Sequence, residues 1–90
     1  MRTYGFKEQM NTSRHKMIQA TSVYFDAERI HVRLSDGREI SAPLDWFPRL
    51  YNATDKQRQQ WELIGRGVGI HWEAIDEDIS VAGLLGLPND

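Results

Sequence analysis

Residues 29–35 of this 90-residue chain alternate strictly between polar and apolar side chains, and this feature constrains the fold most tightly. Ile30, Val32 and Leu34 fall on one side of the alternation, and polar residues fall on the other. Successive side chains of a strand point to opposite faces, so a period of two predicts a half-buried strand. The chain must therefore build a sheet with one covered face.

The Asp-Gly pair at residues 36–37 predicts a hairpin and allows its register to be worked out. A two-residue loop would place the apolar row opposite polar side chains of the next strand. A three-residue loop instead pairs Val32 with Ile40 and Ile30 with Ala42, so both apolar rows share one face. We therefore predict a three-residue loop, residues 35–37, with its glycine in the left-handed region.

The remaining segments complete an α+β pattern. Further strands are predicted at residues 20–25, 38–43 and 70–72. Short helices are predicted at residues 45–50 with Asp45 as N-cap, at 55–64 after a capping box of Thr54 and Gln57, and at 81–87 after Ser80. The glycines at 65–69 then end the second helix. We expect a small antiparallel sheet, a three-strand meander plus a short returning strand, with the helices packed on one face.

Composition limits the class of protein. The chain has no cysteine, a formal net charge of −2 and 40% hydrophobic residues, which is typical of one globular domain without disulfides or thiolate sites. We predict a polar N-terminal tail or arm at residues 1–19, one domain at 20–87 and a C-terminal tail at 88–90. The polar start lacks the apolar stretch of a signal peptide, which favours the cytoplasm.

Three separated motifs resemble a known family. They are SDGREISAPLDWFPRL, then W-x-L-I-G-x-G-x-G-I-H-W, then DEDISVAGLL, and they occur in the order found in the bacterial domain-of-unknown-function family 2442. The resemblance covers about residues 20–87, and it departs at Glu73, where the family often has proline. It implies a small α+β domain of bacteria and their mobile elements. Such genes often lie beside one for another short protein, similar to a toxin–antitoxin pair, and no catalytic residue comes with the family.

The candidate motifs for a cofactor or a metal ion each lack residues that the motif requires, so we predict neither ligand. The glycines at 65–69 lack the lysine and the following helix of a phosphate loop. The acids near residues 76–78 begin like a calcium loop, but Val81 stands at its glycine position. The three histidines show no metal-binding spacing. For His71 we expect a hydrogen-bonded structural role beside Glu73 or an acid of the loop.

The aromatic residues carry the functional hypothesis. Such a small sheet can hardly bury five large rings, and exposed tryptophan and tyrosine are the residue types that anchor interfaces. We predict a non-enzymatic regulatory module that binds a protein partner or a second copy, with no small-molecule substrate. The candidate interface, an aromatic corner plus an acidic loop, comprises Trp46, Phe47, Tyr51, His71, Glu73, Asp76, Glu77 and Asp78.

Two alternatives remain open. A basic strand face could bind nucleic acid despite the net charge, since phosphate contacts need only a local cluster of cations. Its candidate contacts are Arg14, Lys16, Arg29, Arg33 and Arg38. The second alternative is an enzyme that uses His71 with Glu73 or Asp76 as its acid–base pair.

Overall fold

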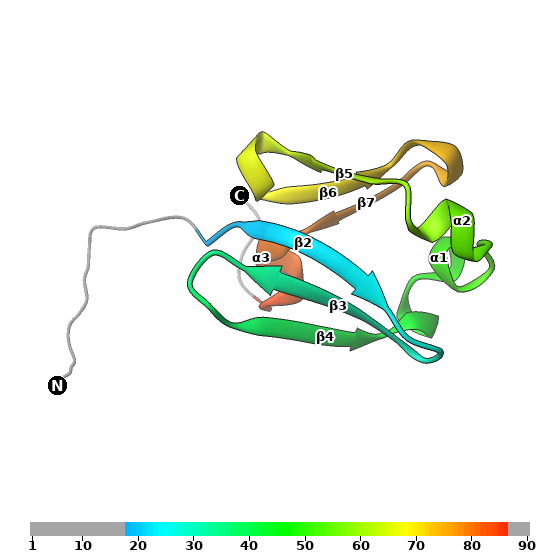
Figure 1. Ribbon diagram of the computed structural model, residues 1–90, viewed down its shortest axis with the longest axis horizontal. Coiled ribbons are helices and arrows are strands. Elements are labelled where there is room, and N and C mark those ends of the chain that lie inside the picture. The colour runs from blue at the N-terminus through cyan, green and yellow to red at the C-terminus, as the bar shows by residue number, and fades with distance from the viewer. Residues whose placement is uncertain (1–17, 87–90) are drawn as a thin grey trace, which may run out of the picture.

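Two antiparallel three-stranded sheets lie one over the other in residues 18–86, the part of the chain that this computed structural model describes (Figure 1). Each sheet is a meander of strands that are consecutive in the sequence. The first comprises β2 (Ala20–Phe25), β3 (Arg29–Leu34) and β4 (Glu39–Pro43). The second comprises β5 (Trp61–Ile64), β6 (Gly69–Trp72) and β7 (Glu77–Ser80). The predicted α+β class is confirmed, and the returning strand belongs to a second sheet of its own.

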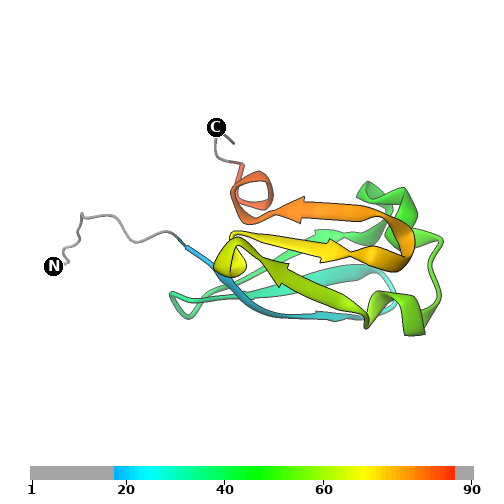
Figure 2. The same cartoon turned by 90° about the horizontal axis from the view of Figure 1, so that it is seen from above.

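Short helices lie at the two ends of this pair of sheets (Figures 1 and 2). The connection between the sheets forms η1 (Leu44–Trp46), α1 (Pro48–Tyr51) and α2 (Asp55–Arg58). Two single turns, η2 (Gly65–Gly67) and η3 (Glu73–Ile75), join the strands of the second sheet. The last helix, α3 (Val81–Leu84), follows β7 directly. None of the helices in residues 18–86 is long and apolar enough to cross a membrane.

The predicted hairpin register is confirmed. Val32 pairs with Ile40, and Ile30 pairs with Ala42. The Leu34 amide donates to the Arg38 carbonyl at 2.8 Å, which closes a three-residue loop. Gly37 within it has φ +94°, the left-handed conformation that the loop requires.

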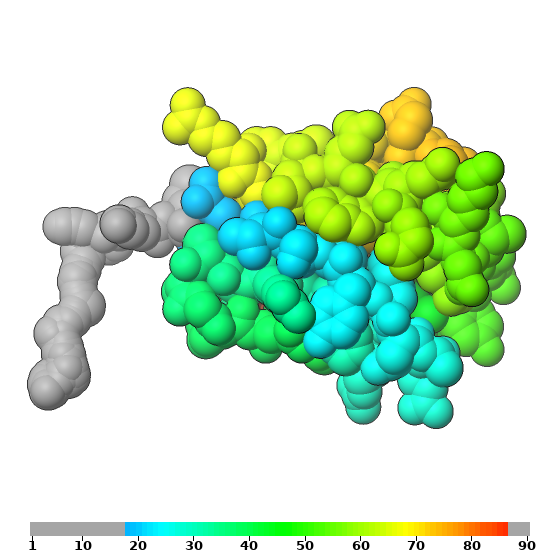
Figure 3. Space-filling view, in the orientation of Figure 1, coloured from blue at the N-terminus to red at the C-terminus, as the bar shows by residue number. Residues whose placement is uncertain are grey.

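One apolar core lies between the sheets and takes side chains from both. Ile30 and Val32 of the central strand β3 are completely buried, as are Ile70 and Trp72 of the other central strand, β6. The indole N–H of Trp72 donates to the Arg58 carbonyl at 3.0 Å, so even this ring leaves no polar atom unpaired. Figure 3 shows the side of the molecule on which β2 of the first sheet lies against β5 of the second.

The prediction of a helix at residues 55–64 is wrong beyond the first turn. The capping box forms as predicted, with the Gln57 amide donating to Thr54 Oγ1 at 3.1 Å, but the helix ends at Arg58. Residues 61–64 instead form β5, whose Trp61 pairs with Trp72. Pairing with β6 satisfies the backbone of these residues and extends the sheet over the core, which outweighs the helix propensity of the sequence.

The glycine-rich segment therefore follows a strand and not a helix, and it forms the tight η2 connection between β5 and β6. Gly65 and Gly67 have φ of +58° and +95°. A Cβ on Gly67 would lie 2.5 Å from the carbonyl oxygen of Ala20, so glycine is needed where this turn packs on the start of β2. The segment is a structural connection between strands.

The helix caps were predicted with mixed success. Asp45 is not an N-cap: it lies inside η1, and α1 begins at Pro48 with no side-chain cap. The proline fixes the first helical φ by itself. Ser80 does cap α3, since its Oγ accepts from the Gly83 amide at 2.9 Å. That helix ends at Leu84. Of the predicted tails, 1–19 and 88–90, only residues 18 and 19 belong to the described part of the chain.

Candidate functional site

The most exposed large apolar side chain in the described chain belongs to η1. Trp46 is 69% exposed, although Leu44 two residues earlier is buried. The reason is local: the Leu44 amide donates to the Glu28 carbonyl at 2.8 Å, and Leu50 is buried a turn later. These two leucines turn the η1–α1 segment so that its tryptophan faces away from the core.

An apolar groove of about 290 Å³ lies beside Trp46. It is lined in part by β7, the edge strand of the second sheet on the side away from β5 (Figure 2). Trp46 and Phe47 form one wall, and β7 and α3 form the other. The lining residues from that second wall are Asp78, Ile79, Ser80, Gly83 and Leu84. The structure thus brings the predicted aromatic corner next to one acid of the predicted acidic segment.

The acidic segment is not the loop that we predicted. Residues 73–75 form η3, and Glu77 already belongs to β7, where it pairs with Trp72 and is half-buried. Asp76 occupies the turn with φ +55°. The Arg49 guanidinium donates to the Asp76 carbonyl and lies 3.7 Å from its carboxylate. This contact ties α1 to the turn before β7 and so fixes the two walls of the groove relative to each other.

His71 lies between two carboxylates on the outer face of β6. Its Nε2 lies 2.7 Å from Glu73 Oε1, and its Nδ1 contacts the carboxylate of Asp78. The hydrogen bond with Glu73, followed by that with Asp78, raises the pKa of His71 to about 9. The predicted hydrogen bonding of His71 to Glu73 and to an acid of the following segment is confirmed. A histidine with that pKa holds its proton at neutral pH, which makes it a poor general base.

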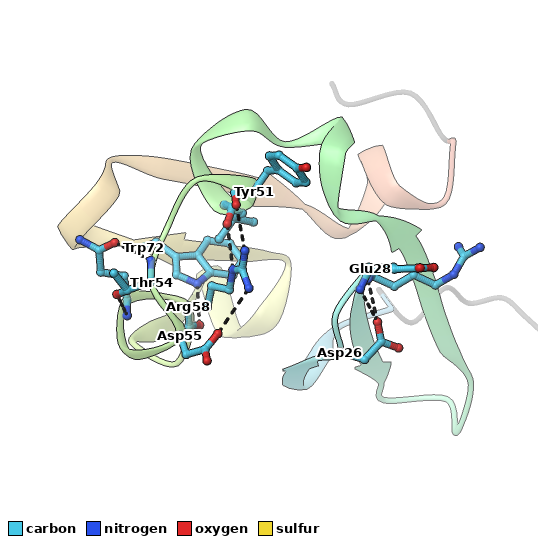
Figure 4. Close-up of polar contacts among 10 residues, drawn as sticks. Asp26, Glu28, Tyr51, Thr54, Asp55, Arg58 and Trp72 are labelled. Carbon is cyan, nitrogen blue, oxygen red and sulfur yellow. Dashed lines mark hydrogen bonds and ion pairs between the residues drawn. The ribbon is translucent and has the colours of Figure 1, made fainter.

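Tyr51 does not join the groove. Its side chain is 57% exposed and borders a separate, polar hollow of about 350 Å³ together with Glu28, Arg29 and Asp45. Figure 4 shows why its backbone is fixed: the Arg58 guanidinium donates to the Tyr51 carbonyl at 2.9 Å. The predicted aromatic corner is therefore divided between two hollows.

The first sheet carries the predicted basic strip on its outer face, but acids interleave with it. Arg33 Nε lies 3.5 Å from Glu39, and Arg38 Nε donates to Asp36 at 2.7 Å. Arg29 lies at the polar hollow, while Arg14 and Lys16 are outside the described residues. The described strip presents pairs of opposite charge and not a basic field, which does not favour nucleic-acid binding.

Sequence reasoning missed one hydrogen-bonded set on this face. His31 Nε2 lies 2.8 Å from Asp26 Oδ2, and His31 Nδ1 lies 2.6 Å from Ser41 Oγ. Asp26 also accepts from two backbone amides, and these bonds, with His31, lower the pKa of Asp26 to about 2. The cross-strand register places Ser41 directly opposite His31. The predicted hairpin register could therefore have indicated this contact from the sequence.

The His31 ring of this set is largely covered. Tyr24 stacks on the His31 ring with 4.6 Å between ring centroids, and only 12% of the His31 side chain is exposed. Neither hollow described above includes His31 or Ser41. The arrangement braces the β2–β3 turn against β4. Nor do residues 18–86 contain a group of three side chains arranged to hold a metal ion.

Comparison with known proteins gives a family and two structural relatives. The profile of the family "protein of unknown function (DUF2442)" matches residues 20–87. A crystal structure of a protein of unknown function from Rhodospirillum rubrum is 31% identical, with a TM-score of 0.68 over 83% of this chain and 94% of that one. An uncharacterized protein from Chromobacterium violaceum, solved by NMR, is 30% identical, with a TM-score of 0.65 over 76% and 64%. No curated protein matches the sequence.

Proposed function

The chain belongs to the DUF2442 family, whose description assigns no chemistry, and we therefore propose its function from the surface: a non-enzymatic protein-interaction module whose partner binds in the groove beside Trp46. The observation that carries the proposal is the exposure of Trp46 (69%) at the rim of an apolar groove. Exposed tryptophans beside hydrophobic hollows are typical anchors of protein interfaces, because the ring buries a large area at low entropic cost.

The way the groove is held supports this proposal. Its η1 wall is fixed by Leu44 and Leu50 in the core, and Arg49 joins α1 to the turn before β7. A binding surface that is already ordered loses less conformational entropy on association. The charge distribution favours a protein over a nucleic acid, because the carboxylate of Asp78 lines the groove and would repel phosphate.

The more specific version is regulatory and antitoxin-like. In this version the partner is the product of the neighbouring gene, as the resemblance of the three motifs to family 2442 implies. Binding would cover Trp46 and hold that product in a complex. An interaction module of this kind needs no catalytic residue of its own.

Co-expression with the neighbouring gene product tests the proposal, with Trp46→Ala as the decisive variant and Tyr51→Ala as the matched control. Both residues are exposed aromatics of the same connection, but only Trp46 lines the groove. We expect the Trp46 change to weaken the complex by at least about tenfold, as for an interface hot spot, and the Tyr51 change to leave it within about twofold. No complex, or equal affinity of the two variants, contradicts the proposal.

A further inference from the structure

We propose that the partner contributes an extended segment that pairs with β7 at Asp78, on the side where β7 has no neighbouring strand in its sheet. In this segment lysine or arginine alternates with large apolar side chains. This inference rests on the proposed function and names the chemistry of the partner. It concerns the same groove, whose second wall includes the consecutive residues Asp78 and Ile79 of β7.

The edge of β7 can be paired at Asp78. The strand order of the second sheet is β5-β6-β7, so β7 has a strand on one side only. The Val81 amide donates to the Val68 carbonyl, and these residues continue the β6–β7 register. In an antiparallel ladder the hydrogen-bonded pairs alternate, so Ile79 faces β6 and Asp78 directs its N–H and C=O away from it.

These two groups of Asp78 have no backbone partner outside the sheet within residues 18–86. An added strand would lie about 4.8 Å from β7 and could pair with them. Short edge strands are the sites at which extended peptides join a sheet, and the backbone bonds supply affinity while alternate side chains supply specificity.

The outer face of the second sheet predicts the charged half of the segment. Glu62, His71 and Asp78 lie opposite one another across β5, β6 and β7, so they form one row. The next position of that row, on the added strand, lies beside the Asp78 carboxylate, which is 67% exposed. Glu73 is 85% exposed next to it. A lysine or arginine at this position meets carboxylates directly across the strand.

The charge around this position is negative overall. From His71 to Ser80 the chain has four acids and a single cationic group, His71, which both Glu73 and Asp78 already contact. The nearby Arg49 binds the turn at Asp76. Complementary charge thus selects a basic segment and disfavours an acidic one.

The inner face of the second sheet, which faces the groove, predicts the apolar side chains of the partner segment. Neighbours of the charged positions on the added strand point the other way, toward the groove, because successive side chains of a strand alternate. There they meet Trp46, Phe47 and Leu84. A valine or leucine at these positions would bury its surface against the indole and the α3 side of the groove.

The test uses the intact chain and three synthetic hexapeptides. The probe is Lys-Val-Lys-Leu-Lys-Val. One control has glutamate in place of each lysine, and the other keeps the sequence but carries N-methyl groups that remove the backbone donors facing β7. Titrations followed by amide chemical shifts give affinities, and hydrogen exchange at Asp78 reports on the edge itself. We expect the probe to bind at least about tenfold more tightly than either control and to slow exchange of the Asp78 amide.

Variants locate the effect. Trp46→Ala should weaken the probe by about tenfold, and Asp78→Asn by about threefold, as expected for an exposed charge pair. Asp55→Asn is the matched control, since that carboxylate is 97% exposed on α2, away from the groove. It should leave binding unchanged.

Three outcomes overturn the inference: no binding of the lysine peptide up to about 1 mM, equal binding of the glutamate peptide, or no effect of N-methylation. The proposed function fails separately. If Trp46→Ala disrupts the co-expressed complex while the lysine peptide does not bind, the groove is an interface but its occupant is not a basic strand.

Discussion

Both sheets carry a histidine on the outer face of their central strand, and the partners of the two rings differ. His31 lies between the carboxylate of Asp26 and the hydroxyl of Ser41, whereas His71 lies between the carboxylates of Glu73 and Asp78. A hydroxyl can donate or accept, so the first arrangement satisfies either protonation state of the ring. Two ionised carboxylates only accept, so the second arrangement requires both ring nitrogens to carry protons.

The difference extends to the surfaces around the two rings. On the first sheet, arginine and glutamate alternate across the strands, and Arg33 lies over the Tyr24 ring at 5.3 Å. On the second sheet, His71 lies in one row with the acids Glu62 and Asp78. One outer face is a balanced network that braces the hairpin, and the other leaves a negative potential beside an apolar groove. Similar geometry on two strands therefore gives two outer faces of different charge, and the more acidic one is the face for which we propose a basic partner.

The largest expected effect distinguishes the hairpin turns of the two sheets. Gly67→Ala should destabilise the protein by about 2–4 kcal/mol, because the new Cβ meets the Ala20 carbonyl oxygen in addition to the cost of a positive φ. Gly37→Ala should cost only about 1 kcal/mol, since nothing lies within 4 Å of its Cβ position. Urea unfolding at neutral pH measures both free energies. Equal losses would show that the η2 turn does not depend on packing against β2.

Raising the pH should weaken the second sheet. The pKa of His71 is raised from 6.5 to about 9 by its carboxylate partners, so the stability that this group contributes is complete below about pH 6.5 and is lost as the pH rises through 9. The urea midpoint of the natural protein should fall over this range. His71→Gln should remove most of that fall, while His31→Gln retains it. A fall of the same size in His71→Gln would assign the dependence to another group.

Lowering the pH should weaken the first sheet, through Asp26. The pKa of Asp26 is lowered from 3.8 to about 2, first by its hydrogen bond from the Glu28 amide. Stability from this carboxylate is therefore present above about pH 3.8 and is lost as the pH falls through about 2. Asp26→Asn should flatten this acid limb of the unfolding curve. A carboxyl titration by NMR with an ordinary midpoint for Asp26 would contradict the proposed bracing of the turn.

The smallest effect concerns the balance of charge on the first face. Arg33→Ala should cost about 0.5 kcal/mol, since the side chain is 62% exposed and its contacts with Glu39 and Tyr24 are solvated. Thermal or urea unfolding, compared at low and high salt, measures the loss and its screening. A loss well above 1 kcal/mol would mean that this network contributes more to folding than exposed ion pairs usually do.

Much of the first sheet could be predicted because its signals are local. The alternation at residues 29–35 and the glycine at position 37 together determine a strand, a turn and a register, all within fifteen residues. Ser80 and Thr54 are likewise predictable as caps, because a cap bonds to an amide two or three residues away. Such features need no knowledge of the rest of the chain.

The second sheet was harder for a physical reason. Residues 61–64 have an apolar content that fits a helix as well as a strand, and only their pairing with β6 decides between them. The pairing of β6 with β7 likewise converts the predicted acidic loop into a hairpin. The groove shares this origin, since Trp46 and Leu84 are far apart in the sequence and meet only once both sheets are stacked. The sequence therefore predicted that Trp46 is exposed, but it could not predict that Trp46 and Leu84 line one groove.

Every strand in the described chain pairs with the strand next to it in the sequence, and this affects how fast the domain can fold. Each meander forms through short loop closures, and only the stacking of one sheet on the other requires distant segments to meet. Folding rates of small domains rise as contacts become more local. The two meanders should therefore gain their structure rapidly, with the stacking of Trp72 onto the first sheet as the slow, committing step.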